Sequence, residues 1–323
     1  MRLRQVAAVA ASALLLAACS NGGPGAGDAP ERVPGRVSPL TGKPQEQPPN
    51  NPAFVVKIEN TGGGEPQYGL NHADLVLEEL VEGGLTRLAA IFYSNLPTKI
   101  GHVRSMRTTD IGIAKPLGAT IVASGGADDT YDKVRDSGLT ALTEDHGAPG
   151  FSSDPAKSRP YNRMLNLQKL NGSAKRNDDI SNYFTWGKGP ASTDVAKSNV
   201  TSATVDFGSG STTGWQFTGG KWGRTKERAA PGQAYKADTL LVLFCRVTEA
   251  GYNDAAGNPV PETVIQGSGR AVIFSGNTAT EANWHKPNLG SPISFTSKSG
   301  KAITLKPGNV FIEATPRGGN VTY

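Results

Sequence analysis

Three arginines in the N-terminal half are the first residues whose types and spacing suggest binding chemistry. Arg104 and Arg107 are three positions apart at the predicted start of a helix, and Arg87 precedes them. Residues at i and i+3 share a helical face, and a helix start offers free N–H groups and partial positive charge. A planar guanidinium binds an oxyanion in a bidentate manner. The predicted contacts to a phosphate, sulfate or carboxylate are Arg87, Arg104, Ser105 and Arg107.

Four carboxylates lie just before these arginines: Asp74, Glu78, Glu79 and Glu82. On a β-strand, Glu78 and Glu82 would point to one face and Glu79 to the other. Glycan-cleaving enzymes use two carboxylates at a set separation, so the cluster allows a hydrolase or lyase. The alternative is a solvated charged face, or ion pairs with the arginines that hold the layers together. Glu79 and Glu82 complete the predicted ligand contacts, and no residue is assigned as catalytic.

The sequence lacks the short signatures of several enzyme classes. It contains no Walker phosphate loop, no G-x-G-x-x-G, no G-x-S-x-G and no S-x-x-K. The four histidines have no zinc spacing, and Asp128, Asp129 and Asp132 lack the spacing of a calcium loop. We therefore expect no metal and no cofactor, and the sequence favours a protein that is not an enzyme.

Three tryptophans in the C-terminal half allow two interpretations. If Trp215, Trp222 and Trp284 are exposed, they can stack on sugar rings. If they are buried, they pack in a core, which is the commoner outcome for tryptophan. Both interpretations stay open at the level of sequence.

A predicted β-hairpin positions the carboxylates and the first arginine. Two apolar runs, Leu75–Val81 and Leu85–Tyr93, flank Gly83-Gly84. Glycine reaches the positive φ that tight turns need, which favours a hairpin here. A helix is the competing prediction for the first run, because its glutamates also fit one polar helical face. Ser105 is the predicted N-cap of a helix over residues 106–114.

The order of predicted elements indicates two lobes. Residues 53–170 contain strands, Gly turns and helices in succession, which is typical of an α/β layer. Residues 171–201 are rich in Ser, Asn, Lys and Gly and form a predicted connection. Residues 202–323 alternate short apolar runs with turn residues, which predicts strands. The expected fold class is α+β, with a mixed α/β N-terminal lobe packed on a β-rich C-terminal lobe.

The N-terminus has the pattern of a lipoprotein signal. A basic start, a short apolar core and small residues before Cys19 predict a signal peptide over residues 1–18 and lipid on Cys19. Residues 19–52 are poor in large apolar side chains, so we expect a flexible, lipid-anchored tether. These features predict a location at the outer face of the cytoplasmic membrane. Cys245 lies in an apolar run and is expected to be a buried, inert thiol.

The charge balance gives no support to nucleic acid as a partner. The chain carries 33 Lys and Arg against 28 Asp and Glu, a formal net charge of +5. Loss of the signal peptide removes Arg2 and Arg4, which leaves 31 against 28, or about +3. So small an excess of positive charge on a chain of this length does not indicate nucleic-acid binding. It is compatible with weak attraction to an anionic wall polymer.

One stretch carries a family resemblance: ADLVLEELVEGG, LTR, LAAIFYS and then IGHVRSMR, within residues 73–107. It resembles the signature of the YerB-like lipoproteins, a bacterial family of unknown function. Leu40-Thr41-Gly42, Arg159-Pro160-Tyr161-Asn162 and a C-terminal region with Trp-His-Lys and Lys-Pro-Gly fit the same pattern, over roughly residues 38–323. The family commonly has His before the Asn where this chain has Tyr161, so a role that needs an imidazole is not carried over.

Three functions follow as hypotheses. The sequence favours a non-catalytic cell-envelope lipoprotein that binds a wall polymer or a wall-synthesis protein as scaffold or regulator. The first alternative is a binding lipoprotein for a small anionic ligand held by the arginines. The second alternative is a carboxylate-dependent hydrolase or lyase of envelope glycan that uses two of Glu78, Glu79 and Glu82.

Overall fold

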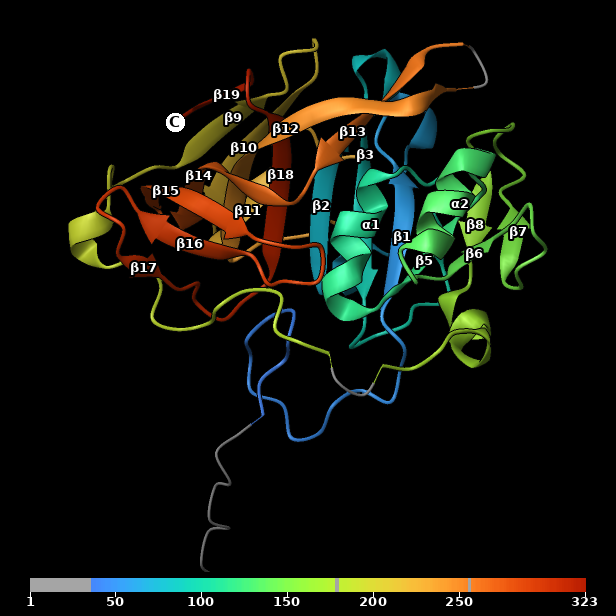
Figure 1. Cartoon of the computed structure of the whole chain (residues 1–323), viewed down its shortest axis with the longest axis horizontal. Helices are drawn as coiled ribbons and strands as arrows, with labels where there is room; N and C mark the ends of the chain where they lie inside the picture. The colour runs from blue at the N-terminus through green and yellow to red at the C-terminus, as the bar shows by residue number, and fades with distance from the viewer. Residues whose placement is uncertain (1–35, 178–179, 255–256) are drawn as a thin grey trace, which may run out of the picture. The chain divides into compact units, whose positions relative to one another are not determined.

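A twelve-stranded mixed sheet runs through both halves of the chain (Figure 1). The computed structural model describes residues 36–177, 180–254 and 257–323, which belong to one compact unit. The strands of the large sheet are β1 (Phe54–Glu59), β2 (Leu75–Leu80), β3 (Thr86–Phe92), β5 (Thr120–Ala123), β6 (Ala141–Thr143), β12 (Thr239–Asn253), β13 (Pro259–Val264), β14 (Gly267–Ser275), β15 (Thr278–Lys286), β16 (Ser294–Ser297), β17 (Ala302–Ile303) and β18 (Val310–Pro316). Their order is β17-β16-β15-β14-β12-β18-β2-β3-β1-β5-β6, with β13 paired to β12.

Two smaller sheets and a few helices surround this sheet. One has the order β11-β10-β9-β19 and the other β4-β8-β7. Their strands are β9 (Ser202–Asp206), β10 (Thr212–Thr218), β11 (Lys221–Arg224) and β19 (Asn320–Thr322), then β4 (Ile100–Gly101), β7 (Phe151–Ser153) and β8 (Arg163–Leu165). The α-helices of the described residues are α1 (Thr109–Ala114) and α2 (Asp128–Asp136), and short 3-10 segments cover Gly62–Gly64, Leu70–His72, Glu82–Gly84, Lys115–Leu117, Leu167–Ser173 and Ser192–Asp194. No helix within these described ranges is long and apolar enough to cross a membrane.

Strand β18 joins the two predicted lobes. It runs parallel to β12 on one side and to β2 on the other, so that Ile312 lies opposite Leu241 and Leu77 (Figure 1). The two halves therefore share one sheet. Strands also dominate the fold, so the structure is mostly β with a few helices, and the expected α+β class holds only loosely.

The predicted hairpin is confirmed. β2 and β3 pair antiparallel, with Leu77 opposite Ala89. The turn between them carries Gly83 at φ 69° and Gly84 at φ 70°, which is the left-handed conformation that favours glycine. The helical alternative for Leu75–Val81 is excluded by this pairing.

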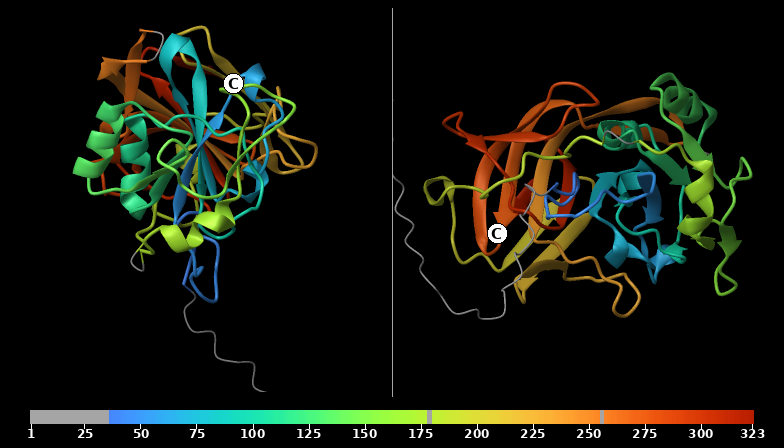
Figure 2. Two further views of the ribbon diagram at one scale, coloured as in Figure 1. Left: turned by 90° about the vertical axis from the view of Figure 1, so that its right-hand side faces the viewer. Right: turned by 90° about the horizontal axis from the view of Figure 1, so that it is seen from below.

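The large sheet buries both of its faces. On one face, Leu77 and Ile312 pack with Ile111 of α1. On the other face, Phe311 packs on Trp215 of the four-stranded sheet, with 4.6 Å between the ring centroids. Figure 2 shows the helices and the four-stranded sheet on opposite sides of the large sheet. Consecutive residues of β2 therefore enter different cores.

The chain packs on this body earlier than its composition predicts. Residues 36–52 fall in the predicted tether, yet Leu40 is fully buried and Val37 forms a β-bridge with Pro44. The backbone N–H of Tyr183 donates to the carbonyl oxygen of Pro39 at 2.9 Å. The tether prediction is therefore wrong for residues 36–52, because one apolar anchor and backbone bonds fix a polar segment. The remainder of the tether, Cys19 and the signal peptide lie outside the described residues.

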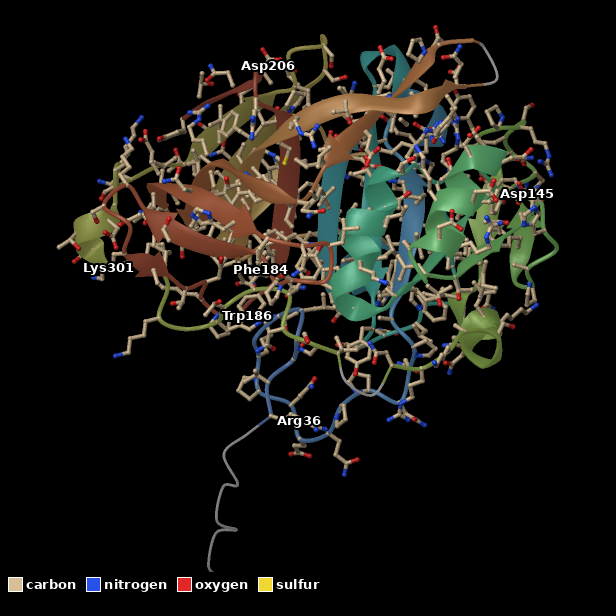
Figure 3. All side chains as sticks on the ribbon, viewed as in Figure 1. Arg36, Asp145, Phe184, Trp186, Asp206 and Lys301 are labelled. Carbon is tan, nitrogen blue, oxygen red and sulfur yellow. The ribbon has the colours of Figure 1, made fainter. Side chains whose placement is uncertain are left out.

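The predicted connection over residues 171–201 is anchored as well. Tyr183 and Phe184 are fully buried, although their neighbours in the sequence are polar. Phe184 forms a bridge with Ile293 and contacts Trp186 edge to face, with 5.4 Å between the ring centroids (Figure 3). These two side chains are therefore part of the core of the described unit.

Ile312→Ala tests whether the halves unfold together. Ile312 is fully buried, and truncation of such a side chain costs about 2–5 kcal/mol of unfolding free energy. We expect that loss in denaturant unfolding, in one transition that coincides for tryptophan fluorescence and far-UV circular dichroism. All tryptophans follow residue 185, so fluorescence reports on the second half. The control is Leu85→Ala at a 49% exposed position, with a change of about 0.5 kcal/mol or less. Two separate transitions would contradict a shared sheet.

Candidate functional site

Two adjoining hollows lie beside the turn of the β2–β3 hairpin, and together we name them the hairpin groove. Their volumes are about 360 and 220 Å³, and both are lined by Thr61, Leu85 and Thr86. The larger hollow is also lined by Glu78, Thr213, Arg224, Lys226 and Arg228, and the smaller by Glu59, Glu82, Arg87, Arg104 and Tyr161. Leu85 is 49% exposed and Tyr161 37% exposed, so the groove offers apolar as well as polar surface.

Glu78 lines the larger hollow and is almost fully buried. Its Oε1 accepts hydrogen bonds from Asn60 Nδ2 at 2.9 Å, Thr86 Oγ1 at 2.7 Å and Thr213 Oγ1 at 3.0 Å. Asn60 directly follows β1, Thr86 is the first residue of β3, and Thr213 lies on β10. The carboxyl group therefore ties the large sheet to the four-stranded sheet.

A second buried carboxyl group, Glu313, is the neighbour of Glu78. The two residues are register partners on the parallel strands β2 and β18, and Trp215 Nε1 donates to Glu313 Oε1 at 2.6 Å. Burial, and then the charge of Glu78, raise the pKa of Glu313 well above its ordinary value, and burial raises the pKa of Glu78. Neighbouring carboxylates in a dry site do not both ionise. Ionisation of both carboxyl groups is therefore disfavoured at this position.

The rim of the larger hollow is basic. Arg224 donates to Asn60 Oδ1 at 2.9 Å and to Gln67 Oε1 at 2.7 Å, and Arg228 forms an ion pair with Glu65. Lys226 is exposed and makes no hydrogen bond or ion pair within the residues that the structure describes. Its ammonium group is therefore available to an anionic ligand.

The smaller hollow contains two of the predicted arginines, and both are paired. Arg104 forms an ion pair with Glu59, and its guanidinium lies 5.0 Å from the centroid of the Tyr161 ring. Arg87 lies 3.4 Å from Glu82. Burial, and then the other arginines of the cluster, lower the pKa of Arg87 to about 10. These contacts fit the alternative in which the carboxylates and the arginines form ion pairs with one another. Contact of Arg87 or Arg104 with a ligand stays a prediction.

The helix expected from Ser105 begins at Thr109 instead. The Asp110 carboxylate accepts the backbone N–H of Arg107 at 2.7 Å, and the Ser105 carbonyl accepts Nη1 of Arg87 at 3.0 Å. Arg107 also forms a bidentate ion pair with Glu82, with Nε 2.8 Å from Oε2. The N-cap prediction for Ser105 is therefore wrong, whereas ligand contacts of Ser105 and Arg107 stay predictions. Neither hollow is lined by Ser105 or Arg107.

Glu79 lies on the opposite face of β2 from Glu78 and is fully buried. It forms an ion pair with Lys57, whose ammonium also lies 2.9 Å from the Asp110 carboxylate. Burial raises the pKa of Glu79 to about 7, although the charge of Lys57 opposes this shift. The three charges hold α1 on the sheet, beyond the reach of a ligand. A ligand contact of Glu79 stays a prediction, and the burial of this side chain does not support it.

Cys245 and the three tryptophans of the C-terminal half that could have bound sugar are buried in the core. Trp215, Trp222 and Trp284 are at most 1% exposed, so the packing interpretation is right and sugar stacking by these residues is excluded. Cys245 is fully buried, and burial raises the pKa of its thiol to about 12. No group of three or more His, Cys, Asp or Glu in the described ranges could hold a metal ion.

Sequence reasoning missed most of the larger hollow. Lys226 and Arg228 lie in a short charged run, Arg224-Thr225-Lys226-Glu227-Arg228, that could have marked a surface of binding interest. Glu313 and Lys57 stand inside apolar runs, where an ionisable side chain needs a buried partner. That rule identifies them as paired residues, but it does not identify their partners.

The fold and the groove define a mostly β protein with an open polar groove, and comparisons with known proteins give its family. Residues 40–181 match the N-terminal domain and residues 203–312 the C-terminal domain of "Protein of unknown function (DUF3048)". The chain belongs to this YerB-like family, as its sequence signature indicated.

Two relatives support this assignment. "Putative lipoprotein YerB" of Bacillus subtilis (strain 168) is 25% identical over 292 residues, which is 86% of each chain. The crystal structure of the YerB protein from Bacillus subtilis matches with a TM-score of 0.73 at 19% identity. The match covers 89% of this chain and 100% of that one. The second similarity establishes a shared fold.

Glu82→Gln tests the arginine cluster through the pH dependence of stability. Burial alone would raise the pKa of Glu82, but the hydrogen bond and charge of Arg107 outweigh it and lower this pKa from 4.5 to about 2. Between these values the folded protein binds fewer protons than the unfolded chain. The carboxylate therefore stabilises the fold above pH 4.5, and this contribution is lost as the pH falls through about 2.

We therefore expect the melting temperature of the wild type to fall more steeply with acid than that of Glu82→Gln, in melting curves between about pH 5 and 2. Glu46→Gln, at an exposed position, is the control and should keep the wild-type slope. Parallel curves for the wild type and Glu82→Gln would contradict the ion pair.

Proposed function

We propose that this chain is a lipid-anchored cell-envelope lipoprotein that binds an anionic, hydroxyl-rich wall polymer in the hairpin groove, as a non-catalytic scaffold or regulator. The observation that carries the proposal is Lys226, an exposed cation without a partner in the described residues, on the rim of a polar hollow. The other two cations of that rim, Arg224 and Arg228, already have protein partners. An anionic group of the ligand would therefore pair with Lys226 first.

The form of the groove supports a polymer over a small ligand. Its two hollows share a wall, so consecutive units of one chain can occupy both. Leu85 and Tyr161 are exposed there, and an aromatic ring backed by the Arg104 guanidinium suits stacking on a sugar ring. Thr212 and Thr213 add hydroxyl groups to the walls. A hydroxyl-rich chain with spaced negative charges matches this surface.

The anchoring part of the proposal rests on the sequence and on one relative. The relative from Bacillus subtilis is named a lipoprotein, and the signal pattern before Cys19 predicts the same for this chain. Lipid on Cys19 would hold the groove near the outer face of the cytoplasmic membrane, where wall polymers are assembled. A wall-synthesis protein is the other class of partner that this location allows.

The Glu78–Glu313 pair favours a second candidate, a carboxylate-dependent hydrolase or lyase of envelope glycan. In glycosidases the two carboxyl groups flank the scissile bond, about 5–10 Å apart. Here Glu313 is fully buried beside Glu78, and Glu82 is held by Arg107 in the hairpin turn. Glu313 lines neither hollow, and the Glu82 carboxylate is already paired with Arg107. This geometry supports binding over cleavage.

The double variant Lys226→Ala/Arg228→Ala tests the groove. We expect it to bind fluorescent polyglycerol phosphate about tenfold or more weakly than the wild type, because two charge-assisted contacts are lost. The measurement is fluorescence anisotropy with the full-length chain in detergent. The matched control, Lys298→Ala/Lys301→Ala, removes the same charge from the β16–β17 turn at the sheet edge and should bind as the wild type does (Figure 3).

Two results would contradict this proposal. Equal losses in both double variants would mean that the polymer is attracted by net charge and not by the groove. New reducing ends released from purified wall glycan by the wild type, but not by Glu78→Gln, would establish the hydrolase instead. The binding proposal predicts that no such ends appear.

A further inference from the structure

A loop of residues 154–162 joins β7 to β8 (Figure 1), and it brings Tyr161 to the smaller hollow of the hairpin groove. The Tyr161 ring lies directly on Gly63, where a Cβ atom would be 2.7 Å from Cε1 of the ring. The ammonium of Lys157 donates to the Gly63 carbonyl oxygen at 2.9 Å. The loop is thus fastened to the 3-10 segment Gly62–Gly64, and its position decides where Tyr161 lies.

A buried histidine holds the start of the same loop. His102 directly follows β4 and is fully buried, and its carbonyl oxygen accepts the backbone N–H of Glu59 at 2.9 Å. Its Nδ1 lies 3.0 Å from the Gly64 carbonyl oxygen, and its Nε2 lies 2.9 Å from Oδ2 of Asp154, the first residue of the loop. The imidazole ring therefore connects the loop to the segment on which Tyr161 rests.

Both partners of this ring are hydrogen-bond acceptors. A carbonyl oxygen accepts and cannot donate. The hydrogen bond from His102 lowers the pKa of Asp154 below its ordinary value, so the carboxylate is ionised at neutral pH and can only accept as well. A neutral imidazole has one N–H and satisfies one of the two acceptors, whereas an imidazolium satisfies both. The geometry therefore selects the protonated ring.

Among the described residues, Asp154 is the carboxylate that pairs with His102. The other ionisable side chains on the segments around the ring are those of Glu59, Glu65, Tyr68, Lys99, Arg104, Lys157 and Arg163. Both glutamates of this set and Arg163 have ion-pair partners of their own. Tyr68 meets the imidazole edge to face, with 6.0 Å between the ring centroids, and the Lys99 ammonium lies 3.8 Å from the centroid of the Tyr68 ring. The Asp154 carboxylate is therefore the group that neutralises the charge of a protonated ring.

We propose that protonated His102 is a positioning residue that holds this loop closed, and that loss of its proton releases the loop and with it Tyr161. Histidine changes its charge between about pH 5 and 8, so the loop would respond to pH in the neutral range. The closed loop keeps the proton on the ring, and a rise in pH removes the proton and opens the loop. The consequence for the groove rests on the proposed function: release of Tyr161 would weaken polymer binding at high pH.

Hydrogen–deuterium exchange of residues 154–161 tests the His102–Asp154 contact in the full-length chain in detergent, without polymer. The exchange is measured at about pH 6 and about pH 8, on either side of an ordinary histidine titration. After correction for the intrinsic pH dependence of exchange, we expect the wild-type loop to exchange about fivefold or more faster at the higher pH, because a charge-assisted hydrogen bond is lost.

Asp154→Asn makes the test specific. Its amide can donate through Nδ2 to a neutral Nε2, while its Oδ1 still accepts the backbone N–H of Ala156, as Asp154 does at 2.9 Å. We expect the loop of this variant to stay closed at both pH values. Asp129→Asn, at an exposed position of α2, is the matched control and should keep the wild-type response.

Equal corrected exchange of the wild-type loop at both pH values would overturn the inference. So would an Asp154→Asn protein whose loop responds to pH as the wild-type loop does.

Fluorescence anisotropy with polyglycerol phosphate tests the consequence for the groove. Between the two pH values, the wild type should lose about threefold or more in affinity relative to Asp154→Asn. The same pH dependence of affinity in both proteins would contradict control of the groove by this loop. Failure of the wild type to bind the polymer at either pH would contradict the proposed function and not the His102–Asp154 contact, which the exchange measurement alone decides.

Discussion

Two consecutive glutamates in the middle of the large sheet constrain the rest of the structure. Glu78 and Glu79 point to opposite faces of β2, and both faces are buried. Glu79 is neutralised by Lys57, which also binds Asp110 at the start of α1. Glu78 lies beside Glu313, where burial raises the pKa of both carboxyl groups, and it accepts a hydrogen bond from Thr213 of the four-stranded sheet. Loss of one partner from a buried ion pair costs about 3–5 kcal/mol, so the Glu79 pairing favours one docking of α1.

The position of the hairpin groove follows from this constraint. The bond from Thr213 to Glu78 holds β10 against the large sheet beside the hairpin turn. The Ser211 hydroxyl donates to the Gly84 carbonyl at 2.6 Å and fixes the two turns together. The groove therefore lies where the two sheets meet, between turns that are hydrogen-bonded to each other. Such a surface suits the binding of a long, polar ligand with little rearrangement of the protein.

Local patterns in the sequence predicted the strands and the hairpin, and they failed where the partner is distant. Phe54–Glu59 and the β2–β3 hairpin were found because apolar runs and Gly83-Gly84 are local signals. The pairing of Glu78 with Glu313 depends on β18 inserting between β2 and β12, which no short window contains. The helix start was misplaced because the Asp110 carboxylate, and not Ser105, accepts the free N–H. Lys226 was missed because surface charge alone does not show which cations lack partners.

The central claim is that the hairpin groove is where this protein holds an anionic polymer. Hydrogen–deuterium exchange of the full-length chain, with and without polyglycerol phosphate, measures this most directly. The account predicts slower exchange confined to the groove segments, residues 60–62, 83–86, 210–214 and 224–228. Slower exchange elsewhere, with these four segments unchanged, would contradict it.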